Sequence, residues 1–134
     1  MAFRILDKMG MEPAEVATVI TAIGHHDDST AYPVNAIAAA LILADKTDVR
    51  RSRVRNKDMS TFDIHDRVNY AVEKASTTLD AAGKAVVLDL QLDTGMSPVI
   101  DYFEIFLERM LLCRKAAEKL GLSFRLVVNG QTVL

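Results

Sequence analysis

The sequence has one cysteine, no tryptophan, six glycines and three prolines among its 134 residues. With a single thiol, Cys113, the chain forms no internal disulfide, which fits a reducing compartment. The low glycine and proline content excludes collagen-like and low-complexity chains, because both are rich in these residues. Half of the residues are hydrophobic, so the chain can bury a core without the disulfides of small secreted domains.

The chain also has no large excess of either charge, because 16 basic residues nearly balance 18 acidic ones and leave a net charge of −2. No overall field favours nucleic acid or a membrane surface, so we expect neither as a partner. The longest apolar run, residues 36–44, is far shorter than the roughly 20 residues of a membrane-spanning helix. No basic segment followed by an apolar run opens the chain, so we expect no secretory signal and a cytoplasmic protein.

The first half of the chain has the hydrophobic periodicity of helices. One helix is predicted over residues 3–9 and a second over residues 13–24, where Gly24 is expected to adopt a left-handed capping conformation. A third, over residues 33–44, is apolar on every side, which predicts that protein surrounds it. Residues 1–58 are therefore interpreted as a helical region.

The second half, residues 59–134, shows the alternation typical of strands with one exposed face. Polar and apolar residues alternate over residues 68–72 and again over residues 88–92. Residues 82–84, Ala-Gly-Lys, lie between these segments and are typical of a turn. The pattern predicts an antiparallel hairpin.

One long helix is predicted after this hairpin, with Ser97 as its cap, Pro98 as its first residue and Gly121 at its end. A final strand over residues 124–128 leads to the turn signal at residues 129–130 (Asn-Gly), which favours a short terminal hairpin. The expected fold class is α+β: a helical region followed by a small antiparallel sheet that one long helix covers.

Asp45 is the first candidate for chemistry. Helical spacing places its carboxylate on the same face as Ile37 and Leu41, where another apolar side chain is expected. Burying a lone carboxylate costs on the order of several kcal/mol unless it is paired or bound to a metal. Three interpretations stay open: an ion pair with a base such as Lys8 or Arg51, a frayed helix end, and a metal site.

The loop at residues 25–28 is the second candidate. His25 and His26, together with the two aspartates that follow, offer four ligands for a divalent ion. The alternative is an ordinary solvated polar loop. The loop lies between two predicted apolar helices, which favours side chains held in place rather than free.

Lys46 and Arg50 lie within about one helical turn of Asp45, and they are the bases that we expect near a bound phosphate. The basic segment over residues 50–57 is interpreted as an exposed connection between the two halves. It contains no aromatic residue on which a base could stack, so a nucleic-acid surface is not favoured.

Residues 23–28 (Ile-Gly-His-His-Asp-Asp), residues 32–33 (Tyr-Pro) and residues 40–46 (Ala-Leu-Ile-Leu-Ala-Asp-Lys) together resemble the later part of an HD-superfamily metal-dependent phosphohydrolase domain. In that family a histidine, a His-Asp doublet and a later aspartate bind one or two divalent metals in a helical bundle. The resemblance covers residues 3–55. Some bacterial members carry a β-β-α-β segment after the helical part, as expected here.

The resemblance implies a role for each candidate residue. Asp45 and His26 would be ligands of a divalent metal ion whose identity is open. His25 and His26 would be catalytic, serving a second metal or the substrate phosphate, and Lys46 and Arg50 would bind that phosphate. The substrate would be a small molecule that carries a phosphate group.

The family's first histidine and its His-Asp doublet would precede Phe3, where the sequence has only Met1 and Ala2. The resemblance therefore implies a partial domain. We expect an upstream helical segment, on the same or another chain, or a second copy in a homo-oligomer, to complete it. The alternative is a non-catalytic regulatory or assembly module derived from an HD domain.

Overall fold

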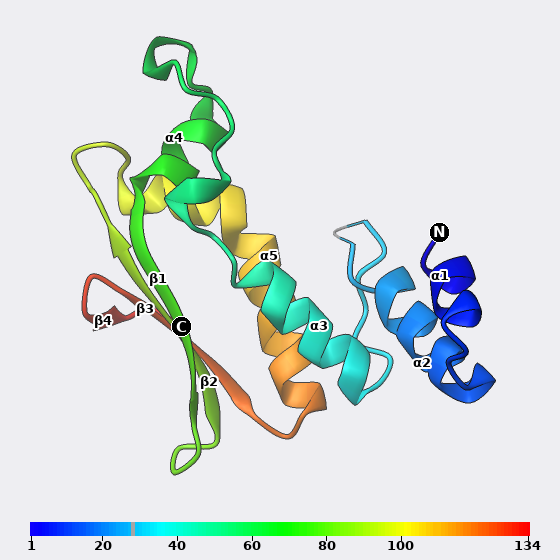
Figure 1. Ribbon diagram of the computed structural model, residues 1–134. Helices are drawn as coiled ribbons and strands as arrows, with labels where there is room; N and C mark the ends of the chain where they lie inside the picture. Colours follow the sequence, from blue (N-terminus) through cyan, green and yellow to red (C-terminus); the bar gives the residue numbers. More distant parts are fainter. Residues whose placement is uncertain (28) are drawn as a thin grey trace.

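The computed structural model describes residues 1–27 and 29–134. Three α-helices come first, α1 (Ala2–Lys8), α2 (Pro13–Gly24) and α3 (Ala36–Lys46), and Figure 1 shows them in blue and cyan. Two short 3-10 helices, Arg51–Arg53 and Met59–Thr61, connect them to the second half. That half contains α4 (Ile64–Ala71), β1 (Val72–Asp80), β2 (Ala85–Leu92), α5 (Val99–Lys119), β3 (Ser123–Val128) and β4 (Gln131–Thr132).

The four strands form one sheet in the order β1-β2-β3-β4. β1 pairs with β2 antiparallel, β2 pairs with β3 parallel, and β3 pairs with β4 antiparallel. The α+β class is confirmed, but the purely antiparallel sheet is wrong. The reason is that α5 crosses over one face of the sheet between β2 and β3, so β3 returns in the direction of β2.

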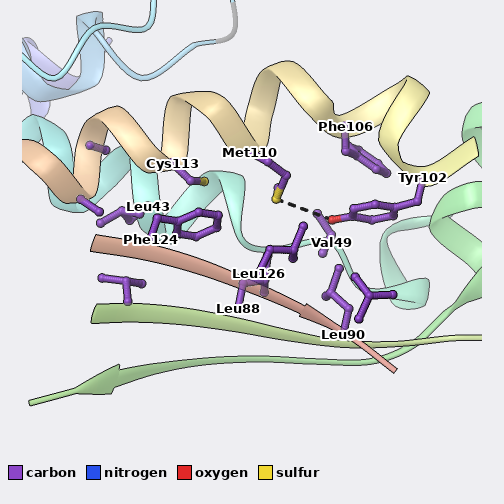
Figure 2. Packing of buried hydrophobic residues seen from close by; sticks show 14 of the residues in the cluster. Leu43, Val49, Leu88, Leu90, Tyr102, Phe106, Met110, Cys113, Phe124 and Leu126 are labelled. Atoms are coloured by element: carbon purple, nitrogen blue, oxygen red, sulfur yellow. Dashed lines mark hydrogen bonds between the residues drawn. The ribbon is translucent and has the colours of Figure 1, made fainter. Parts of the chain in front are cut away.

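The core lies between α5 and the sheet (Figure 2). Leu88 and Leu90 of β2 and Leu126 of β3 are fully buried beneath the helix. Six residues of α5 are buried: Tyr102, Phe106, Met110, Cys113, Ala116 and Ala117. Helix α3 packs beside α5 and adds Ala39, Ile42 and Leu43 to the same cluster, so both halves of the chain share one core.

The predicted strand over residues 68–72 is wrong, because residues 64–71 form α4. The Asp63 side chain caps this helix by accepting a hydrogen bond from the backbone N–H of Asp66, at 2.8 Å. Val68 and Ala71 are buried, and a separation of three residues puts them on one helical face. Five alternating residues are too few to outweigh this cap, and the strand begins only at Val72.

Three predicted helix ends differ from those in the structure. Gly24 is the last residue of α2, and its cap, His25, has a φ of −116° rather than a left-handed conformation. Asn35 caps α3 through its side chain, so this helix begins at Ala36 and not near Pro33. The cap of α5 is Pro98, which has no side-chain hydrogen bond to offer, and Ser97 is buried just outside the helix.

The sequence also predicts that protein surrounds α3, and the structure shows otherwise. Ala38, Ala39, Ile42 and Leu43 are buried, whereas Ile37 on the opposite side is 53% exposed. An apolar residue on every side therefore does not imply burial on every side. The helix covers α5 with one face and leaves an apolar face uncovered.

Candidate functional site

Both candidate histidines are held by the last turn of α2. The Nδ1 atom of His25 lies 2.8 Å from the carbonyl oxygen of Thr21, and that of His26 lies 2.6 Å from the carbonyl oxygen of Ile23. A carbonyl oxygen only accepts, so each Nδ1 carries the hydrogen and donates it. In the neutral ring this leaves the lone pair on Nε2, the arrangement in which backbone carbonyls orient metal-binding histidines.

The loop after α2 folds back on the end of that helix. The backbone N–H of Tyr32 donates to the carbonyl oxygen of His25 at 3.1 Å, and the Thr30 hydroxyl donates to that of Gly24 at 3.3 Å. Asp27 is exposed. Asp28, the fourth predicted ligand of the loop, lies outside the described residues.

Asp45 and Lys46 form an ion pair at the end of α3, with Nζ of Lys46 2.7 Å from Oδ2 of Asp45. The buried residue of the pair is the lysine: its side chain is 3% exposed, against 32% for the aspartate. The predicted burial of Asp45 is therefore wrong. The next residue, Lys46, is the one that shares the buried face of α3 with Ile42 and Leu43. An ion pair was one of the open interpretations, but the partner is Lys46 and neither Lys8 nor Arg51.

Cys113 is buried on the face of α5 that contributes to the core. Burial raises the pKa of the Cys113 thiol to about 12, the charges of Arg109 and Lys46 oppose the rise, and the charge of Asp45 adds to it.

The same burial predicts an unreactive thiol. Cys113 has no exposed surface, and its raised pKa leaves almost no thiolate at pH 8. Because the thiolate is the nucleophile, iodoacetamide is expected to alkylate the folded chain at least roughly 100-fold more slowly than the chain unfolded in urea. Intact-mass measurements over time would follow the reaction. Equal rates in the two states would show that Cys113 is accessible.

Arg50 lines a groove of about 540 Å³ beside the end of α3. Thr47, Asp48 and Thr77 of β1 also line this groove. Nε of Arg50 donates to Asp48 at 2.7 Å and Arg53 donates to its other oxygen at 3.0 Å, and these bonds lower the pKa of the Asp48 carboxyl. A phosphate bound by Arg50 would compete with Asp48 for the guanidinium.

The basic segment is anchored at Arg51 rather than exposed throughout. Nε of Arg51 donates to the carbonyl oxygen of Tyr70 at 2.6 Å, and its guanidinium lies 4.3 Å from the centre of the Tyr70 ring. This contact ties the segment to α4. Arg50, Arg53, Arg55 and Lys57 are exposed, as the interpretation of a solvated connection expects.

The candidate residues come from two segments of the chain. His25 and His26 follow α2 directly, and Asp45 is the next-to-last residue of α3. Over residues 1–27 and 29–134, no group of three or more histidine, cysteine, aspartate or glutamate side chains lies close enough to hold a metal ion.

Sequence reasoning missed Arg109. Its position, three residues after Phe106 and four before Cys113, falls on the apolar stripe of α5, and a charge on such a stripe is the signal that identified Asp45. The guanidinium lies 5.5 Å from the centre of the Phe106 ring. Arg109 also lines the cavity of about 620 Å³ that is described below.

Searches of family models, curated proteins and solved structures found no match to this chain. In the described residues, no helix is long and apolar enough to cross a membrane.

Proposed function

We propose that this chain supplies the last aspartate and the phosphate-binding cations of an HD-type metal-dependent phosphohydrolase, acting on a phosphate ester or a nucleotide-like phosphate. The observation that carries the proposal is the end of α3. There a nearly buried ammonium group fixes a partly exposed carboxylate at 2.7 Å, in the segment that resembles the family.

The candidate ligand atoms of this chain, carboxylate oxygen and imidazole nitrogen, are of the types that bind divalent ions. The Lys46 ammonium occupies Oδ2 of Asp45, and a carboxylate has a second oxygen that can act as a ligand. His25 and His26 present Nε2 lone pairs because their Nδ1 atoms donate to the backbone. These residues form only part of a ligand shell, so the proposal requires further ligands, which a second copy of this chain supplies in a homo-oligomer.

A divalent ion in such a site lowers the pKa of a bound water and neutralises phosphoryl oxygens. The chain's own residues then have separate tasks. Lys46 sets the orientation of the Asp45 carboxylate, and its cationic charge favours an anion nearby. The Arg50 side chain is 61% exposed and lines the groove. To bind a phosphate there, its guanidinium gives up its ion pair with Asp48 and pairs with the phosphate instead.

The proposal is tested on the purified protein with Mn²⁺. Uptake of Mn²⁺ is measured by elemental mass spectrometry after desalting, and hydrolysis of p-nitrophenyl phosphate is followed with and without EDTA. We expect metal uptake and hydrolysis that EDTA removes. Neither uptake nor hydrolysis, or hydrolysis that persists in EDTA, would contradict the proposal.

The alternative function is a non-catalytic regulatory or assembly module, and one observation favours it. The helical region exposes large apolar side chains: Phe3 is 56% exposed, Ile5 51% and Met9 75%, and Ile37 of α3 is half exposed as well. Exposed apolar groups on neighbouring helices are typical of a face that a partner covers.

Light scattering in EDTA separates the two functions. A module of this kind assembles through apolar contacts, so its molar mass is expected to stay above that of a monomer when the metal is chelated. A monomer in EDTA, together with EDTA-sensitive hydrolysis in the assay above, would favour the hydrolase.

A further inference from the structure

A cavity of about 620 Å³ lies where the long helix meets α4 and the loop after α2. Its volume is within the range of small-molecule sites, which is about 300–1,000 Å³. Arg109, Glu108 and Lys115 of α5 line it, and His65 and Asn69 of α4 face them. The candidate residues His25, His26 and Asp45 do not line this cavity.

Positive charge dominates the polar lining. Among the lining residues that the structure describes, Arg109 and Lys115 are cationic at neutral pH and Glu108 is the single acid. Asn69 and His65 add uncharged donors on the opposite wall, since a neutral imidazole still carries one N–H. The guanidinium of Arg109 is held against the Phe106 ring, which restricts its orientation.

Apolar groups complete the cavity. Ile105 and Phe106 precede Arg109 along α5, and Leu112 lies between Arg109 and Lys115. Phe106 belongs to the core, and Leu112 packs against it. A ligand that complements both the cationic and the apolar part of the lining has an anionic group attached to an apolar or aromatic group. Two cations favour a phosphate monoester over a carboxylate, because the monoester carries a charge near −2 at neutral pH.

We propose that this cavity binds a small organic phosphate, with Arg109 and Lys115 on the phosphate group and Ile105, Phe106 and Leu112 on the organic part. The site goes beyond the proposed function, since it uses neither a metal nor the side chains of His25 and His26. It gives the β-β-α-β half a ligand of its own. Ala31, from the loop after α2, also lines the cavity and brings the two halves together there.

The experiment is an NMR titration of the ¹⁵N-labelled chain in EDTA with AMP, phenyl phosphate, benzoate and adenosine. We expect AMP and phenyl phosphate to shift the amide signals of residues 105–115 and 65–69, and to bind at least fivefold more tightly than benzoate or adenosine. Binding is expected to weaken as salt is raised, because the contacts are ionic.

Two substitutions locate the phosphate group. Lys115→Glu reverses an exposed charge at the cavity and is expected to weaken AMP binding at least fivefold. Arg114→Glu makes the same change one residue away, on an exposed side chain that does not line the cavity, and is expected to bind AMP as the wild type does. Arg109→Gln, checked for folding by its amide spectrum, is expected to weaken AMP binding at least as much as Lys115→Glu.

The proposal is overturned if neither phosphate shifts these signals at millimolar concentration. It is equally overturned if the shifts lie elsewhere, or if Lys115→Glu and Arg114→Glu bind AMP equally. Because EDTA is present throughout, the result is independent of the metal-dependent hydrolysis assay, and either proposal can fail while the other holds.

Discussion

Replacing Asp45 with asparagine is expected to abolish both metal binding at the end of α3 and EDTA-sensitive phosphate-ester hydrolysis. The amide keeps the size of the side chain and removes the charge that attracts a divalent ion. Mutation of a group that only hydrogen-bonds to a metal ligand lowers metal affinity by about 10–100-fold. Loss of the ligand itself is therefore expected to lower metal affinity by at least about 100-fold.

Paramagnetic broadening by Mn²⁺ measures this effect even when binding is weak. In the wild type, substoichiometric Mn²⁺ is expected to broaden the amide signals of residues 44–47 first, and in Asp45→Asn these signals should remain sharp. The matched control is Asp89→Asn, an exposed aspartate on the outer face of β2. If both variants respond to Mn²⁺ as the wild type does, Asp45 is not a ligand.

The same comparison distinguishes a metal ligand from a structural ion pair. If Asp45 served only to neutralise the Lys46 ammonium, its replacement would destabilise the end of α3. It would leave the response to Mn²⁺ unchanged. Amide spectra of Asp45→Asn without metal report the first effect, and the titration reports the second.

Several elements of the fold could be predicted because their signals are local. The first residue of α2 follows from Pro13, and the end of α5 follows from Gly121, whose φ of +73° favours glycine. The strand over Ala85–Leu92 follows from alternating leucines. The turn at Asn129 and Gly130, both with positive φ, gives the terminal hairpin.

The failures depend on information that single segments do not contain. The alternation at residues 68–72 fits a strand, but the Asp63 cap and the packing of Val68 select a helix. The direction of β3 depends on how α5 crosses the sheet, which no strand pattern records. Tertiary packing decides both.

The candidate site shows the same limit. Periodicity predicts that Asp45 lies on the buried face of α3, but in the structure Lys46 is the buried residue. The buried face is the one that contacts α5, and the apolar pattern of α3 does not define where α5 packs. A helix with apolar residues on every side gives no preferred face. Arg109 was missed although its spacing from Phe106 and Cys113 marks it as a charge on an apolar stripe.

The core predicts that the two halves unfold together. Leu88 of β2 is fully buried under α5, in the cluster to which α3 contributes Ile42 and Leu43. Leu88→Ala is expected to lower the free energy of unfolding by about 2–5 kcal/mol, through lost burial and the cavity that it leaves. For a chain of this length the melting temperature should fall by roughly 10 °C.

The control for this variant is Leu79→Ala on β1, where the side chain is 66% exposed and the change is expected to stay within about 0.5 kcal/mol. Thermal unfolding is followed by circular dichroism, and the amide signals of α3 are recorded through the transition. Because α3 shares the core of the sheet, its signals should disappear at the lowered melting temperature of Leu88→Ala. If they persist above it, residues 1–58 fold independently, and the end of α3 would hold its Asp45–Lys46 pair without support from α5.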